Sequence, residues 1–236
     1  MLLRLDKILA DTGLWSRKEA RALIRAGRVW ASGAPVIAPE TRWDPDTAAL
    51  TVDGVPLAVS VRHYFMLHKP AGVLSATEDR RQHTVLDLLG PAERRMGLFP
   101  VGRLDKDTTG LLLLTDDGPL AHKLISPKYH VPKVYLADID GRAGEEDIAA
   151  FAAGLVLEDG SVCRSAKLED LGEGRVRVTL QEGKYHQVKR MLAARGKPVT
   201  ALHREEFGPL KLDPALSPGS YRPLTKEERQ ALETLC

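Results

Sequence analysis

The sequence predicts an α+β protein with a small first domain and a larger second one. Strand and helix signals alternate without the regular crossover rhythm of a doubly wound parallel sheet. With 236 residues, 43% of them hydrophobic, the chain is long enough for one substantial core and a small accessory domain. A composition shift at "AVSVRH" places the boundary near residue 60. We therefore expect domains over 1–60 and 61–236.

Short elements are predicted at both ends of the first domain. The stretch "LDKILADTGL" has apolar residues at helical spacing between Leu5 and Leu9 and stops at Gly13, which predicts a short helix. Further along, "RVWASGAPV" reads as a strand followed by a turn. The segment "ALTVDGVPL" reads as a second short strand that is broken at Asp53-Gly54.

A second helix is predicted between Ser16 and Gly27. It should begin at Ser16, because Glu19 follows three residues later in the capping-box pattern, and it should end at Gly27. One face is apolar, and a second face carries Arg17, Arg21, Arg25 and Arg28. Residues 1–33 hold seven Lys or Arg against three Asp or Glu. Aligned cations with only Glu19 nearby repel one another, a cost that phosphates would remove. The stripe therefore indicates RNA binding, and a solvated helix face is the alternative.

The second domain contains four predicted strands and four predicted helices. The helix over 144–157 has acidic first-turn residues, the strand over 174–183 has clean period-two alternation, and the last helix closes at Gly196. Strands are expected over 63–70, 110–116, 133–141 and 174–183, and helices over 83–90, 118–127, 144–157 and 186–196.

Four aspartates fall within thirteen residues: Asp105, Asp107, Asp116 and Asp117. Part of this stretch matches the spacing of an EF-hand calcium loop, but its last position lacks the required Glu and "LLLL" reads as a strand. Calcium binding is therefore not expected. Asp107, Thr108 and Thr109 are expected to be turn residues, because such side chains form hydrogen bonds with the nearby backbone.

Asp105 differs from the other aspartates because Arg103 and Lys106 flank it. A nearby cation keeps a carboxylate ionised even where water is scarce. Ionised, Asp105 could act as a nucleophile or as a base.

Several other classes of protein and site are disfavoured. Cys163 and Cys236 provide no disulfide framework, so a reducing cytosol is expected. The first residues lack a signal-peptide core, and the longest weakly polar stretch, 148–157, is far shorter than the roughly 20 residues of a membrane span. Seven scattered histidines predict no metal site, and His186 reads as a local hydrogen-bonding residue. No phosphate-binding loop suggests a nucleotide cofactor.

Longer motifs carry a family resemblance. The stretch "RLDKILADTGLWSRKEARALIRAGRV" resembles the S4 RNA-binding domain. "HKPAGVLSA", "GRLDKDTTGLLLLTDDG", "KVYLADIDG" and "EGKYHQVKRML" are similar, in order, to the motifs of pseudouridine synthases with an N-terminal S4 domain. The resemblance implies a mixed, largely antiparallel sheet with flanking helices as the catalytic domain.

This resemblance implies a reaction without cofactors. The N1–C1′ bond of one uridine is broken, and the uracil is turned and rejoined through C5. Asp105 would be the essential carboxylate. It would attack the sugar or the base, or it would accept a proton from the sugar. The logic parallels glycosidases, in which a carboxylate faces an electron-poor sugar carbon.

The resemblance also implies roles for other side chains. Tyr135 would lie against the uracil, with core packing as the alternative, and Lys189 would pair with Asp105 where related synthases often place arginine. Lys189 and Arg190 could instead be a solvated pair or simple phosphate contacts. The expected RNA-binding residues are Arg4, Lys7, Arg17, Lys18, Arg21, Arg25, Arg28, Arg103, Lys106 and Arg190.

Four shorter stretches, "TDDG", "ISPKYHVPKVY", "HQVKRM" and "LHRE", most resemble the small-subunit branch, which modifies a uridine in 16S rRNA. The expected partner is therefore 16S rRNA or an assembling small ribosomal subunit, bound by a monomer. The alternatives are a 23S rRNA synthase of the same family and an RNA-binding assembly factor without catalysis.

Overall fold

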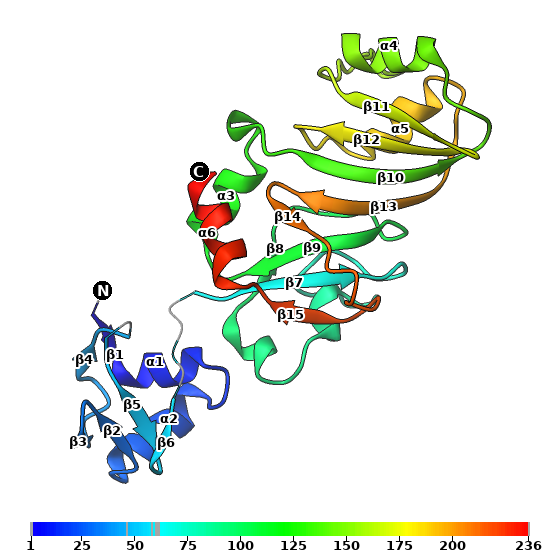
Figure 1. Cartoon of the computed structure of the whole chain (residues 1–236). Coiled ribbons are helices and arrows are strands. Elements are labelled where there is room, and N and C mark those ends of the chain that lie inside the picture. Colours follow the sequence, from blue (N-terminus) through cyan, green and yellow to red (C-terminus); the bar gives the residue numbers. More distant parts are fainter. Residues whose placement is uncertain (1, 46, 58, 60–61, 236) are drawn as a thin grey trace. The chain divides into compact units, whose positions relative to one another are not determined.

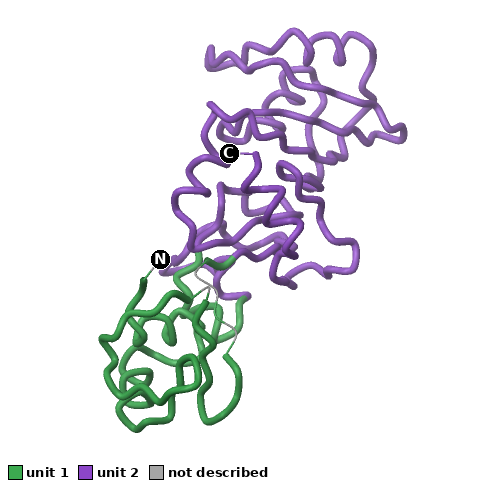
Figure 2. The backbone as a smooth tube through the Cα atoms, turned by 60° about the vertical axis from the view of Figure 1, so that its left-hand side comes forward, with its two compact units in different colours: residues 1–63, 89–98 green, residues 64–88, 99–236 purple. Residues whose placement is uncertain are grey.

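The computed structural model describes residues 2–45, 47–57, 59 and 62–235. Two compact units make up the chain, Met1–His63 with Leu89–Leu98, and Tyr64–Leu88 with Phe99–Cys236 (Figure 2). The first unit thus includes a short segment from the middle of the sequence. The expected boundary at residue 60 lies outside the described residues.

The first unit combines two helices with a four-stranded sheet, in the order β3-β2-β5-β6, and a separate β1–β4 pair. Its elements are β1 (Leu3–Arg4), α1 (Leu5–Asp11), α2 (Arg17–Arg25), β2 (Val29–Ala31), β3 (Ala34–Val36), β4 (Arg42–Trp43), β5 (Leu50–Val52), β6 (Val55–Pro56) and the 3₁₀ helix η2 (Glu93–Met96).

The local signals for helix α2 are confirmed. The Ser16 hydroxyl accepts a bond from the Glu19 amide at 3.3 Å, and the Glu19 carboxylate accepts one from the Ser16 amide at 2.6 Å. At the end of α1, Gly13 has φ +74°, and a Cβ there would collide with the carbonyl of Ala92. Gly13 therefore lets the segment Leu89–Leu98 lie against the end of α1.

The second unit is built on a nine-stranded mixed sheet (Figure 1). Its main order is β11-β12-β10-β13-β9-β7-β15, with β14 on β13 and β8 on β9. Only the β13–β9 pair is parallel among the described strands. The α+β class and the largely antiparallel sheet are thus confirmed.

The strands of this unit are β7 (Tyr64–Lys69), β8 (Phe99–Pro100), β9 (Thr109–Thr115), β10 (Lys133–Ile139), β11 (Lys167–Gly172), β12 (Arg175–Leu180), β13 (Val199–Phe207), β14 (Leu210–Lys211) and β15 (Tyr221–Pro223). The helices of this unit are α3 (Gly118–Ile125), α4 (Glu145–Ala153), α5 (Gln187–Ala193) and α6 (Lys226–Thr234), and it has two 3₁₀ helices, η1 (Val85–Leu88) and η3 (Pro127–Tyr129).

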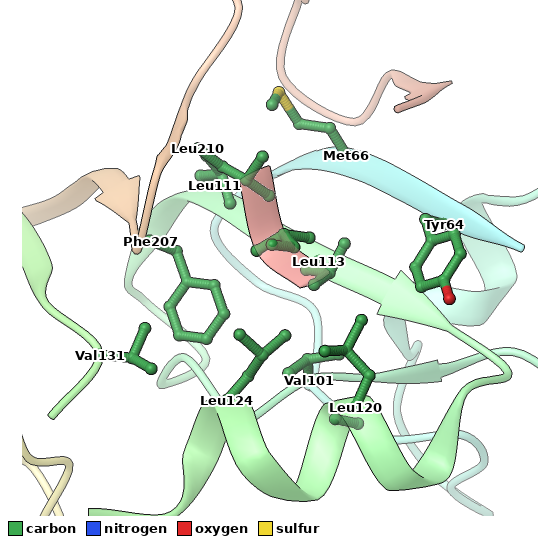
Figure 3. Packing of buried hydrophobic residues seen from close by; sticks show 12 residues of the cluster. Tyr64, Met66, Val101, Leu111, Leu113, Leu120, Leu124, Val131, Phe207 and Leu210 are labelled. Atoms are coloured by element: carbon green, nitrogen blue, oxygen red, sulfur yellow. The ribbon is translucent and has the colours of Figure 1, made fainter. Parts of the chain in front are cut away.

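Strand β9 is buried on both faces, which explains its run of four leucines. Leu111 and Leu113 point into a core that also contains Leu124 of α3 and Phe207 of β13 (Figure 3). Burial holds the strand in place directly after the loop that carries the aspartates, so the loop is anchored at its C-terminal end.

Some elements differ from the sequence-based expectation. The helix expected over 144–157 ends at Ala153, because Gly154 has φ +87° and a Cβ there would meet the carbonyl of Cys163 at 2.6 Å. The segment 83–90 forms only the 3₁₀ turn η1. The sequence analysis did not predict the two-residue strands β1, β4, β8 and β14, the longer strands β11, β13 and β15, or helix α6.

Candidate functional site

Lys69 fixes the backbone of the aspartate loop. This side chain is fully buried at the end of β7. Its ammonium group donates to the carbonyls of Asp105 at 3.0 Å, Lys106 at 3.2 Å, Thr108 at 2.8 Å and Pro70 at 3.1 Å. Burial lowers the pKa of Lys69 to about 8, against the opposing charges of the nearby carboxylates. The group therefore still carries its charge at neutral pH in most molecules.

A second clamp holds the other side of the loop. The buried Ser75 hydroxyl donates to the Leu104 carbonyl at 2.8 Å and accepts from the Leu104 amide at 3.0 Å. The Gly72 amide donates to the Lys106 carbonyl at 2.8 Å. Residues on both sides of Asp105 are thus fixed by backbone contacts, which orients its side chain.

The Asp105 carboxylate lies beside two groups from the start of α5. One oxygen is 3.5 Å from Nε2 of His186, and the other is 3.4 Å from Nζ of Lys189. Lys189 makes a shorter contact, 2.6 Å, with Asp107, whose pKa this hydrogen bond lowers. The Asp105–Lys189 pair expected from the sequence is present, but Lys189 is shared, and the closer partner is Asp107.

His186 is the neighbour of Asp105 that sequence analysis missed. It was interpreted as a local hydrogen-bonding residue, yet its ring faces the carboxylate. Its position three residues before Lys189 was the available signal, because residues three apart project from the same side of a helix. The parallel strand pair β13–β9 and the packing of α5 against β13 bring these distant segments together.

Asp105 and Tyr135 line the same pocket, which has a cavity volume of about 70 Å³. Arg103 and His186 line its polar part, and Leu180 contributes to its apolar wall. Tyr135 and its neighbour Val134 point to opposite faces of β10. Tyr135 is 9% exposed, so it both packs in the interior and borders the pocket. The cavity has room for several water-sized groups.

A larger hollow of about 730 Å³ lies elsewhere on this unit. Val134 lines it, and Val134 points to the face of the sheet opposite Tyr135. Its charged groups are largely paired with one another, as in the Arg177 contacts to Glu169 and Glu205. Asp105 does not line this larger hollow, so the candidate site is the smaller pocket that contains Asp105.

The other cations expected to bind RNA in this unit lie in different surroundings. Arg103 is exposed and borders the Asp105 pocket. Lys106 is exposed and donates to the side chain of Gln82 at 2.7 Å. Arg190 points to Asp159, at 2.6 Å, and lines a separate hollow. Neither Arg103 nor Lys106 forms an ion pair with Asp105 in the described part of the chain.

In the first unit, two arginines of the expected basic stripe, Arg17 and Arg21, have a partner within the protein. The carboxylate of Asp6 is completely buried and accepts hydrogen bonds from Arg4, Arg17 and Arg21. Burial alone would raise the pKa of Asp6, but these three hydrogen bonds hold it well below its usual value. The expectation that only Glu19 offsets these arginines is wrong, because Asp6 is their shared partner.

The other cations of the first unit that were expected to bind RNA divide into two groups. Arg28 pairs with Asp53 at 2.5 Å, and Lys7 pairs with Asp11 at 2.5 Å. Lys18 and Arg25 are exposed and form no ion pair with any residue that the structure describes. Of the expected RNA-binding residues in this unit, these two are therefore the ones most available to contact phosphate.

No group of three or more His, Cys, Asp or Glu side chains that could hold a metal ion occurs among the described residues. The calcium-loop spacing is interrupted because β9 begins at Thr109, inside the matching stretch. In the same described segments, no helix has the length and apolar character that crossing a bilayer requires.

The arrangement can therefore present one oriented carboxylate, with two nitrogen groups within 3.5 Å of it, to a small pocket that has an aromatic wall. A carboxylate favours reactions in which positive charge develops on a nearby substrate carbon. An aromatic ring beside it suits a planar substrate.

Comparisons with known proteins match this description. Residues 63–194 match the model of the RNA pseudouridylate synthase family, and residues 3–41 match the S4 domain. The chain is 50% identical to an uncharacterized RNA pseudouridine synthase of Bacillus subtilis, with 98% of each chain covered. It is 42% identical to ribosomal small subunit pseudouridine synthase A of Escherichia coli K12, with 96% of this chain and 98% of that relative covered.

A crystal structure of a pseudouridylate synthase has 38% identity and a TM-score of 0.69, and the match covers 98% of this chain and 99% of the other. The family model spans more than half of the chain, and the fold agrees with it. The chain therefore belongs to the RNA pseudouridylate synthase family and is an RNA-modifying isomerase that carries an S4 domain.

Proposed function

We propose that this enzyme converts one uridine of 16S ribosomal RNA to pseudouridine. The observation that carries this proposal is the 42% identity, over nearly the full length, to enzymes named ribosomal small subunit pseudouridine synthase A. The substrate would be 16S rRNA or the assembling small subunit.

Within this proposal, Asp105 is the essential carboxylate. Lys69 and Ser75 hold the adjoining backbone, and Lys189 lies 3.4 Å from one carboxylate oxygen. The cation offsets the cost of placing a carboxylate next to RNA phosphates. Tyr135 lies in the wall of the same pocket and would pack against the uracil once the base leaves its stack.

The test is to map pseudouridines by carbodiimide treatment and primer extension in 16S and 23S rRNA, from cells with and without this protein. We expect one stop in 16S rRNA to disappear without the protein. Loss of a stop only in 23S rRNA would instead support the large-subunit alternative. No lost stop in either rRNA, with binding intact, would support the assembly-factor alternative.

For RNA docking, we expect the double substitution Lys18→Gln and Arg25→Gln to weaken rRNA binding by about 10-fold and to reduce the salt slope by about two. Both side chains are exposed, so the melting temperature should stay within about 1 °C. Filter binding at several salt concentrations measures the affinity and the slope.

Arg28→Gln is the matched control, because Arg28 is engaged by Asp53. It should affect binding less than the double substitution does. An unchanged slope in the double variant would show that this face of α2 does not contact phosphates. Arg17 and Arg21 are unsuitable probes, because their removal would also uncover the buried charge of Asp6.

A further inference from the structure

Tyr185 and His186 form a stacked aromatic pair next to Asp105. Their ring centroids are 3.8 Å apart, and the ring planes differ by 18°. His186 lines the Asp105 pocket and lies 3.5 Å from the carboxylate. Tyr185 is 76% exposed, the highest value among the exposed large hydrophobic side chains described. The pair thus extends from the carboxylate to solvent.

The segment that carries this pair is held rigidly. The Lys184 amide donates to the side chain of Gln187 at 2.9 Å, and the Gln187 amide group donates to Glu182 at 2.5 Å. The Lys184 ammonium group binds the carbonyl of Val162. His186 has φ +50°, a left-handed conformation that a non-glycine residue keeps only where its surroundings impose it. These contacts fix the backbone that carries the two rings, and the Tyr185 ring lies against the ring of His186.

An exposed Tyr held against a fixed ring gains little burial, while each unpaired RNA base has an aromatic face that stacks on such a surface. A uridine that enters the pocket is extruded from its stack, which leaves its neighbours in the strand without a stacking partner. Because His186 lines the Asp105 pocket and Tyr185 stacks on it, a base next to a uridine in that pocket would be close to the exposed face of Tyr185.

We propose that Tyr185, supported by His186, is a stacking platform for a nucleobase next to the uridine held at Asp105. The platform rests on the proposed function in one respect, which is that the reaction takes place at Asp105. Because stacking accepts any base, the platform would position the strand and would not read its sequence.

The kinetic test compares Tyr185→Leu with Tyr185→Phe, which keeps the ring. We expect the leucine variant to raise KM for rRNA by roughly 5- to 100-fold with kcat changed less than about threefold, and the phenylalanine variant to match the wild type. Leu171→Ala removes another exposed apolar side chain of this unit and should have no effect. An unchanged KM for Tyr185→Leu, or a phenylalanine variant as impaired as the leucine variant, would overturn the proposal.

A binding test separates the platform from the reaction. In the Asp105→Asn protein, Tyr185→Trp should give tryptophan fluorescence that 16S rRNA quenches beyond the quenching of Asp105→Asn alone, as stacking requires. Extra quenching together with an inactive wild-type enzyme would keep the platform and refute the proposed reaction. An active wild-type enzyme with no extra quenching would refute the platform and keep the reaction.

Discussion

Asp105→Asn is expected to reduce pseudouridine formation at least roughly 1,000-fold, the scale of losing a group that acts on the reacting atoms. Asparagine has nearly the same shape but carries no charge, so it can serve neither as a nucleophile nor as a base. The side chain is 27% exposed, and its neighbours Lys189, at 22%, and His186, at 37%, also reach solvent. Folding should therefore be affected little. Single-turnover assays on rRNA measure the rate, and thermal melting measures stability.

Asp107→Asn is the matched control, because Asp107 is two residues away and binds the same lysine. Its side chain is 75% exposed. Removing its charge leaves Lys189 free to approach Asp105, so the rate should stay within about tenfold of the wild type. If both variants lose activity equally, the reaction depends on the charge of the cluster and not on the Asp105 carboxylate itself.

The sequence predicts elements whose signals are local. The capping box of α2 involves Ser16 and Glu19, three residues apart, and β12 alternates buried and exposed residues because one of its faces is covered. These signals need no knowledge of the tertiary structure, and they were sufficient for the α+β class and for most elements.

Strand β13 shows why other elements could not be predicted. Its sequence "VTALHREEF" contains two glutamates and a buried arginine, a composition that does not resemble a central strand. Arg204 is tolerated because its guanidinium donates to the Leu111 carbonyl, 93 residues away, and lies over the Phe207 ring. Only the assembled sheet supplies the carbonyl partner.

In the candidate site too, the sequence predicts local features but not the partners that the tertiary structure supplies. Asp105 could be singled out as a carboxylate flanked by cations, but the true neighbours of its side chain come from α5, and the flanking Lys106 turns to Gln82 instead. The basic stripe of α2 was visible in the sequence, whereas its partner Asp6 lies on another helix. Spacing along one helix says nothing about the charge that packs against it.

Lys69→Met should lower both stability and activity. The substitution leaves four carbonyl oxygens without their shared donor, three of them in the loop that carries Asp105. The carbonyls of Lys106 and Asp105 keep the amides of Gly72 and Thr108 as donors. One buried unsatisfied acceptor costs about 1–3 kcal/mol, so we expect the other two carbonyls to cost at least about 2 kcal/mol in the free energy of unfolding. Chemical denaturation of the purified variant measures this loss.

The effect on activity tests the positioning role of Lys69. A shift of the loop by about 1 Å is enough to slow a reaction roughly 100-fold, so kcat of the folded variant should fall by that order while KM changes little. Assays must be run at a temperature where melting curves show the variant to be folded. A wild-type kcat in the folded variant would show that Lys69 only stabilises the protein.

Lys133→Met provides the matched comparison. Lys133 is also a buried lysine of this unit, and burial likewise lowers its pKa to about 8. Its ammonium group donates to one carbonyl, that of Val131, and lies over the Phe207 ring, away from the aspartate loop. Replacing Lys133 removes a buried charge that has only one carbonyl acceptor within the described structure. The free energy of unfolding should therefore change less than in Lys69→Met, and kcat should remain near the wild-type value. If both variants reduced kcat equally, the cause would be a general loosening of the unit, because of these two lysines it is Lys69 that contacts the backbone of Asp105.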